Sequence, residues 1–196
     1  MKDLAANKFI KLSKKLNTPL KVQDFLKTFK YNKKDTLRSA YSCLKSKEAH
    51  CMEAAMLAAA ILEPLGYPPL IISFESIDGL DHVIFIFRHK GLWGSIGRSR
   101  DRGLHGRAPK FRTLKSLALS YYAPYVDKTG KITAYQLANL DDTNTNWRSS
   151  KRSVWKAERY LLDLKHIKVK SNPKKFKKLK EAYLKKGPLT KGQYWW

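Results

Sequence analysis

Cysteine is scarce in this sequence, because Cys43 and Cys51 are the only two in 196 residues. Two thiols eight positions apart do not make the framework of a disulfide-stabilised domain. A chain of this length also buries a sizeable core without such bonds. We therefore expect both thiols to be reduced, in a protein located in the cytoplasm.

Long apolar runs are also missing. The opening segment, MKDLAANKFIKLSKKLN, is broken by charged residues and does not have the pattern of a signal peptide. The longest weakly polar run, Met52 to Leu62, is too short to cross a bilayer. Because 43% of the residues are hydrophobic and 12% are aromatic, we expect one folded domain with no membrane span.

Acidic residues are few, 16 against 40 lysines and arginines, and the net charge is +24. In residues 1–48, 13 basic and 4 acidic residues give +9; in 49–147, 11 and 9 give +2; in 148–196, 16 and 3 give +13. Such basic ends attract phosphates and anionic surfaces, so nucleic acid or another polyanion is one predicted partner. For the lysine-rich tail, the alternative is a solvated amphipathic helix docked through Phe176 and Leu179.

The most distinct predicted helix runs from about His50 to Glu63, where alanine, leucine and methionine face nearly every direction. It begins either after a Ser46 cap, with Cys51 in its second turn, or near His50, with Cys51 in its first. Further helices are expected after Thr18-Pro19, after Asp35, over 113–122 and 147–164, and after Asn172-Pro173, followed by an aromatic tail, Gln193 to Trp196.

Short apolar runs between turn residues predict strands. A turn at His89-Lys90-Gly91 joins two of them in a hairpin, and a hairpin centred near residues 89–90 would place His82 opposite Gly97. The stretch Arg98–Arg112, rich in arginine and glycine, is expected to be a loop. The predicted strands are 70–74, 83–87, 92–97 and 132–140.

Cys51, at the start of the apolar helix, and His82, at the start of a strand, are the parts of a Cys–His nucleophile pair. The thiolate is the nucleophile, and a helix start and a neighbouring imidazolium both favour it. Backbone amides near such a cysteine can also bind the oxyanion of a tetrahedral intermediate. Cys51 and His82 are therefore the candidate catalytic residues.

Other interpretations of the same residues stay open. A cysteine in an alanine-rich helix is most often a small core residue, and a lone histidine is often hydrogen-bonded for structural reasons. Zinc binding through Cys43, His50, Cys51 and His82 lacks a familiar ligand spacing. We expect neither a metal nor an organic cofactor.

The order of elements adds a family resemblance. A helix with cysteine, a strand, a strand with histidine and a strand with tryptophan follow one another in the motifs CMEAA, DHV and GLW. Together with GSIGRSRDRGLHGR and SYYAPYVD, these motifs resemble the core of the transglutaminase-like superfamily, in a bacterial branch without an assigned function. The resemblance spans about His50 to Leu140.

This resemblance implies a papain-like α+β fold and a Cys–His–Asp triad that cleaves or transfers amide bonds. It also implies that Cys51 is the nucleophile and His82 the base. The aspartate of the family is missing, because Gly97 stands at the position expected opposite His82. Asp101 is the nearest carboxylate and the candidate third member; its alternative is a salt bridge in a solvated loop.

The arginine-rich stretch is expected near the mouth of the site. Arginines bind carboxylates and phosphates well, so an anionic group of the substrate is expected there unless the arginines pin the loop through its carbonyls. Trp93 is a further candidate, although packing behind the site suits it better. The candidate substrate-binding residues are Trp93, Arg98, Ser99 and Arg100.

These patterns predict an α+β protein with a central helix packed on a small antiparallel sheet. The expected segments are a basic helical segment at 1–34, a transglutaminase-like core at 35–140 and a basic helical extension at 141–196. The predicted function is a cysteine-dependent peptidase, amidase or acyl transferase with a peptide or protein amide substrate. The alternatives are a catalytically inactive binding module of the same fold and a basic protein that binds nucleic acid or another polyanion. The sequence leaves the substrate and the oligomeric state open.

Overall fold

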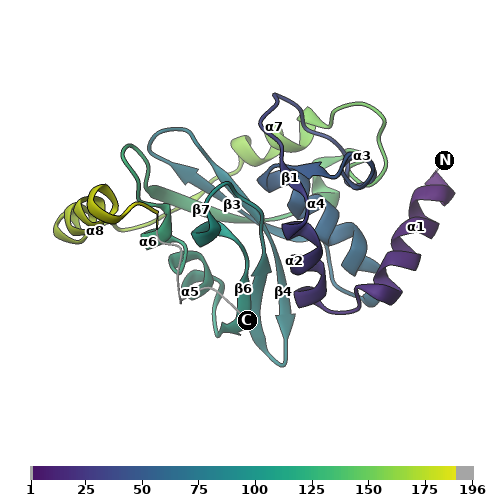
Figure 1. Cartoon of the computed structure of the whole chain (residues 1–196), viewed down its shortest axis with the longest axis horizontal. Coiled ribbons are helices and arrows are strands. Elements are labelled where there is room, and N and C mark those ends of the chain that lie inside the picture. The colour runs from purple at the N-terminus through teal and green to yellow at the C-terminus, as the bar shows by residue number, and fades with distance from the viewer. Residues whose placement is uncertain (1, 189–196) are drawn as a thin grey trace.

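A computed structural model of the protein describes residues 2–188 and has a mixed α+β fold (Figure 1). The predicted aromatic tail, Gln193 to Trp196, lies outside the described residues. No helix among the described residues is both long and apolar enough to cross a membrane. The described residues form a six-stranded sheet with helices on both of its faces, and a separate pair of short strands.

The sheet has the strand order β6-β5-β4-β3-β7-β8, and every neighbouring pair is antiparallel. A separate short parallel pair joins β1 to β2 just before the central helix. The strands are β1 (Lys30–Tyr31), β2 (Glu48–Ala49), β3 (Leu70–Ser76), β4 (His82–His89), β5 (Leu92–Ile96), β6 (Arg107–Phe111), β7 (Ile132–Asn139) and β8 (Ile167–Lys168).

Helix α4 (Cys51–Leu62) packs on one face of this sheet, and helices α5 and α6 cover the other (Figure 1). Eleven residues of α4, all except Cys51, are buried, as its apolar sequence predicts. The helices around α4 are α1 (Lys2–Lys15), α2 (Pro19–Lys27), α3 (Ala40–Ser46) and α7 (Trp155–Asp163); on the opposite side lie α5 (Leu114–Leu119), α6 (Tyr122–Tyr125) and, further out, α8 (Pro173–Lys186).

Residues 83–87 of strand β4 are all apolar because this part of the strand is buried on both faces. Val83 and Phe85 face the α4 side of the core, whereas Ile84 and Ile86 belong to the cluster on the α5 side. Side chains alternate between the two faces of a strand, so a strand buried on both faces has no polar positions. This central strand carries His82 at its first residue.

Four details differ from the sequence predictions. The predicted helix 147–164 begins only at Trp155, because Trp147 is instead buried in the core and donates its indole N–H to Asp141. The predicted helix 113–122 is split into α5 and α6, and the cap of α3 is Ser39 rather than Asp35. The predicted loop 98–112 contains a 3-10 turn, η2 (Arg102–Leu104), and the edge strand β6.

The hairpin register also differs from the prediction. Lys90 and Gly91 both have positive φ, at 47° and 79°, so they form a two-residue turn and His89 pairs with Leu92. The same register pairs Phe85 with Ile96, which places Gly97 opposite Ile84. Extending the register aligns His82 with Ser99, so the prediction that Gly97 faces His82 was wrong by two positions.

Candidate active site

Cys51 is the first residue of α4, with His50 as the N-cap, so the second of the two predicted starts is confirmed. The first-turn backbone N–H groups of a helix lack intrahelical partners and favour a negative charge. Cys51 is half-buried and is the only residue of α4 whose side chain is not fully enclosed. The helix start therefore presents one thiol at its open end.

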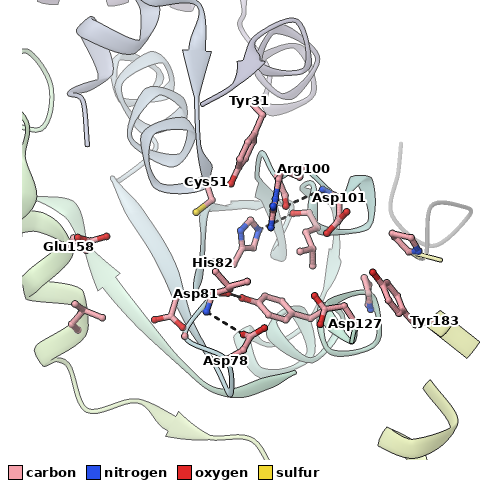
Figure 2. A pocket seen from close by; sticks show the side chains of 18 residues that line it. Tyr31, Cys51, Asp78, Asp81, His82, Arg100, Asp101, Asp127, Glu158 and Tyr183 are labelled. Carbon is pink, nitrogen blue, oxygen red and sulfur yellow. Dashed lines mark hydrogen bonds between the residues drawn. The ribbon is translucent and has the colours of Figure 1, made fainter. Parts of the chain in front are cut away.

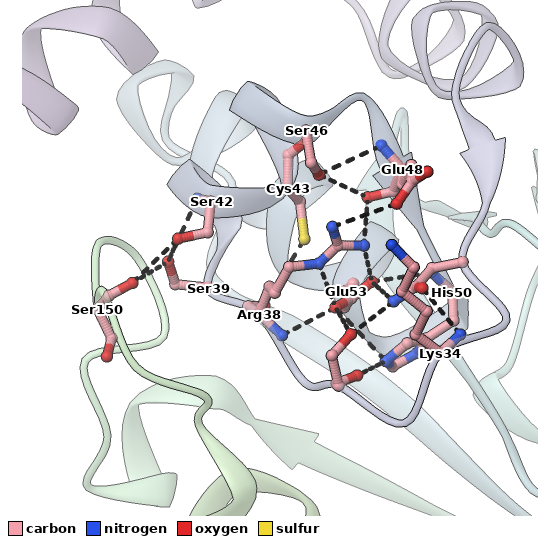
Figure 3. A network of polar contacts seen from close by, with 12 residues as sticks. Lys34, Arg38, Ser39, Ser42, Cys43, Ser46, Glu48, His50, Glu53 and Ser150 are labelled. Carbon is pink, nitrogen blue, oxygen red and sulfur yellow. Dashed lines mark hydrogen bonds and ion pairs between the residues drawn. The ribbon is translucent and has the colours of Figure 1, made fainter.

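A buried carboxylate, Glu53, holds this helix start in place (Figure 3). Its oxygens accept hydrogen bonds from the Arg38 side chain at 3.0 and 3.2 Å, from the Asn32 amide at 3.0 Å and from the His50 backbone N–H at 3.1 Å. Burial raises the pKa of Glu53, but these partners outweigh it and leave the pKa below its usual value. Glu53 is therefore a charged group that fixes the first turn of α4, which carries Cys51.

His82 is buried, and its ring lies next to the Cys51 sulfur (Figure 2). Its Nε2 is 3.0 Å from the carbonyl oxygen of Leu104. A carbonyl only accepts hydrogen bonds, so we assign the hydrogen to Nε2, which leaves Nδ1 as the basic nitrogen of the neutral ring. A backbone carbonyl thus orients the imidazole, as a carboxylate would in a triad.

The Leu104 carbonyl comes this close because Gly97 has no side chain. A β-carbon at Gly97 would lie 3.0 Å from the Ile84 Cγ2 and 3.2 Å from the Leu104 oxygen. Gln23 of α2 fixes the same glycine, since its amide oxygen accepts from the Gly97 N–H at 2.9 Å and its amide nitrogen donates to the Gly97 carbonyl at 3.1 Å. Gly97 therefore makes room for the carbonyl that orients His82.

Two arginines hold the segment that carries Leu104. Arg98 donates to the carbonyls of Ser99 and Phe29 at 2.8 and 3.0 Å. Arg107 is buried, lies over the Tyr121 ring and donates to the carbonyls of residues 103, 105 and 106. For these two side chains the interpretation as loop-pinning groups is confirmed, and neither extends to the thiol.

The electrostatics around Cys51 favour the thiolate. Burial raises the pKa of the thiol, but hydrogen bonding and positive charge from His50 and His82 outweigh it and lower the pKa to about 5. Burial lowers the pKa of His50, but the Cys51 thiolate, Glu53 and the Thr36 carbonyl raise it to about 8. At neutral pH the site therefore holds a thiolate flanked by imidazole rings.

Cys51 and His82 open onto a cleft of about 510 Å³ (Figure 2). Tyr31, at the end of β1, points its hydroxyl toward the thiol. Burial and the negative charge of Cys51 raise the Tyr31 pKa to about 12, so the phenol stays a hydrogen-bond donor at neutral pH. The residues that line the cleft with Cys51 include Tyr31, His82, Ser99, Arg100, Asp101 and Leu104.

The structure brings together some of the residues predicted for the site and separates others. Ser99, Arg100 and Asp101 line the cleft with Cys51 and His82. Asp101 is not the hydrogen-bond partner of His82, because that position belongs to the Leu104 carbonyl. Trp93 lies outside the cleft lining, packed in the α5 side of the core under Arg88, and Arg98 is turned into the loop.

Three contributors to the site were not predicted: the Leu104 carbonyl, Gln23 and Tyr31. No sequence motif marks a carbonyl, although a glycine in place of the expected aspartate was a signal that another group fills that space. Within residues 2–188, no three His, Cys, Asp or Glu side chains are grouped as ligands for a metal ion. Comparisons of the chain with protein-family models and with curated proteins found no match.

Proposed function

We propose that the protein is a cysteine-dependent amide-bond enzyme, a peptidase, amidase or acyl transferase that works through an acyl-enzyme. One observation carries this proposal: a thiol with a lowered pKa opens a helix beside a histidine whose far nitrogen is held by Leu104. The resemblance of the motifs around Cys51 and His82 to the transglutaminase-like superfamily supports it.

In this mechanism the Cys51 thiolate attacks the carbonyl carbon of an amide, forming a C–S bond and an oxyanion. We assign the stabilisation of that oxyanion to backbone N–H groups at the start of α4 and to the Tyr31 hydroxyl, which points toward the thiol. The tetrahedral intermediate collapses when the C–N bond breaks and the His82 imidazolium gives a proton to the leaving amine. The products are a thioester on Cys51 and a free amine.

The thioester is then resolved with His82 as the base. The imidazole takes a proton from water or from an incoming amine, which attacks the acyl carbon and releases the thiolate. Water gives a carboxylic acid and an amine gives a new amide. The Leu104 carbonyl holds the His82 ring in the same orientation during acylation and during resolution of the thioester. The same ring nitrogen therefore donates the proton in the first step and accepts it in the second.

Capture of the acyl-enzyme tests this proposal. The full chain is mixed with a peptide p-nitrophenyl ester, and intact and peptide mass spectrometry locate the acyl group. We expect one adduct on Cys51, fast release of p-nitrophenol, and loss of both in Cys51→Ala with an unchanged melting temperature. Cys43→Ala is the matched control, because Cys43 lies on the fully buried side of α3 and its replacement should not affect acylation. Equal turnover by wild type and Cys51→Ala would refute the assignment.

A second candidate function, polyanion binding, is favoured by the C-terminal helix. The partly buried Phe176 and Leu179 dock α8 on the body, which leaves most of its seven lysines exposed. No ion pair between these lysines and a carboxylate occurs within the described part of the chain. Deletion of residues 171–196 should then weaken heparin or RNA binding and lower its salt dependence, whereas Cys51→Ala should not.

A further inference from the structure

The cleft at Cys51 is acidic, although the protein as a whole carries a charge of +24. Five of the sixteen acidic residues of the chain line it, against one arginine, Arg100, and the histidine of the candidate pair, His82. At physiological ionic strength the field of remote lysines is screened beyond about 8 Å, so the charges on the cleft walls decide what enters. The five acidic residues are Asp78, Asp81, Asp101, Asp127 and Glu158.

Within the described part of the chain, the hydrogen-bond partners of these carboxylates are uncharged groups. Asp78 and Asp127 accept hydrogen bonds from Thr129, and Asp81 accepts from the Ser76 backbone N–H, so their partners are uncharged groups. None of the five takes part in an ion pair within residues 2–188. Among the described residues, the cleft lining therefore carries more negative than positive charge.

The carboxylates of Asp78 and Asp127 both lie close to Gly130. A β-carbon at Gly130 would lie 2.9 Å from the Asp78 Oδ2 and 3.2 Å from the Asp127 Oδ1. Thr129 donates to both carboxylates, and hydrogen bonds from Ser76 and Thr129 lower the pKa of Asp78 although burial opposes them, so Asp78 is held in its charged form. Burial and neighbouring negative charge raise the pKa of Asp81 and Glu158. A bound cation would offset the negative charge of these groups.

Apolar side chains line the same cleft as the acids. Leu80 and Leu162 line the cleft with 58% and 63% of their surface exposed, together with Tyr125. Exposed leucines beside carboxylates match a side chain that has a long apolar stem and a positive end. This pairing is independent of the acids and points to the same ligand chemistry.

We propose that the substrate of the Cys51 site carries a lysine or arginine side chain next to the acyl group that the thiol attacks. This inference rests on the proposed function. The stem lies on Leu80 and Leu162, and the charged end lies near Asp81, with Glu158 as a further acid of the cleft lining. In this proposal the acidic residues of the cleft select the substrate, and the arginines of residues 98–112 do not.

Thiol-directed peptide probes test the inference. Three peptidyl acyloxymethyl ketones, identical except for lysine, norleucine or glutamate at the residue next to the ketone, are reacted with the full chain, and the rate of Cys51 labelling is measured. Norleucine keeps the lysine stem without its charge. We expect lysine to react ~10-fold faster than norleucine, glutamate to be slowest, and the lysine preference to shrink in about 0.5 M NaCl.

Charge-removing variants locate the effect. Asp81→Asn and Glu158→Gln should each lower the lysine-to-norleucine ratio by about threefold, and the double variant by more. Asp163→Asn is the matched control, because Asp163 is exposed on the same helix as Glu158 but does not line the cleft. The control should leave the ratio unchanged.

Reaction with iodoacetamide distinguishes failure of the proposed function from failure of this inference alone. If Cys51 reacts with it no faster than an ordinary free thiol, the proposed function fails. If Cys51 reacts rapidly but lysine, norleucine and glutamate probes label it equally, the inference alone is overturned. Faster labelling by the glutamate probe would also overturn it and would favour the anionic substrate that Arg100 suggests.

Discussion

The side-chain amide of Gln23 satisfies both backbone groups of Gly97, accepting from its N–H at 2.9 Å and donating to its carbonyl at 3.1 Å. Both residues are buried. The contact ties α2 to the end of β5, where the chain turns toward the Leu104 carbonyl. The orientation of His82 therefore depends on a glutamine 59 positions earlier in the chain.

Replacing this glutamine tests that dependence. Gln23→Met keeps the length of the side chain but leaves the Gly97 N–H and carbonyl without partners, which should lower the free energy of unfolding by about 2–4 kcal/mol. Urea unfolding measures the loss. Gln136→Met is the control, because the Gln136 amide bonds to Lys165 near the surface and its loss should cost far less. Equal effects of the two substitutions would contradict the role given to Gln23.

Gly97→Ala should affect the site more than the fold. The new methyl group would press on Ile84 and on the Leu104 carbonyl, which moves the acceptor away from His82. We expect slower acylation of Cys51 and a midpoint of alkylation shifted to higher pH. The double variant Gly97→Ala with Ile84→Leu removes the Cγ2 methyl group and so relieves the contact with residue 84 only. It should recover stability without recovering acylation. Recovery of both would show that the carbonyl is not involved.

Glu53→Gln should be strongly destabilising. It removes the charge opposite Arg38 in a buried pair, which typically costs about 3–5 kcal/mol. Glu48→Gln is the control, since Glu48 contacts the same arginine at 3.6 Å but is partly exposed. Because the Glu53 pKa is lowered on folding, its contribution is present above the unfolded value of about 4.3 and is lost as the pH falls through the lower folded value. The difference between wild type and Glu53→Gln should therefore shrink in acid.

His50 should have the opposite pH dependence. Folding raises its pKa from 6.5 to about 8, so its stabilising contribution is full below pH 6.5 and is lost as the pH rises through about 8. We expect His50→Gln to cost about 1–2 kcal/mol more near pH 6 than near pH 9. Denaturant unfolding of both proteins at the two pH values measures this. An unchanged difference would mean that His50 does not pair with the thiolate.

The thiol itself gives a direct measurement. With a pKa of about 5, Cys51 should alkylate at its full rate already near pH 7, whereas an ordinary thiol is mostly protonated there. His82→Ala should move the midpoint upward and slow labelling at neutral pH. Mass spectrometry separates Cys51 from Cys43. A midpoint near the free-thiol value of about 8.5, unaffected by His82→Ala, would identify Cys51 as a structural cysteine.

Local sequence patterns predicted the parts of this fold better than their connections. The alanine-rich run set the limits of α4, and the apolar runs predicted β3, β4, β5 and β7 to within a few residues. The register of the hairpin was missed because it depends on the positive φ of Lys90, a residue that rarely adopts it. Helix α7 was overextended because Trp147 has a helix-compatible neighbourhood but is buried through tertiary contacts.

In the candidate site too, features set by local sequence were predictable and features set by tertiary contacts were not. Cys51 and His82 were identifiable because their residue types carry the chemistry and their elements are regular. The partner of His82 was not, since a carbonyl is present at every residue and only the path of the backbone selects Leu104. The acidic walls were also missed, because Asp81 and Glu158 are far apart in the sequence and meet only in the folded cleft.

The walls of the cleft come from nearly the whole chain, beginning with Tyr31 and ending with Tyr183 and Pro188. A ribosome makes Cys51 early, but His82 follows 31 residues later and Glu158 more than a hundred residues later. During synthesis the chain therefore carries Cys51 well before it carries the rest of the cleft lining. That lining is complete only after the residues up to Pro188 have been made.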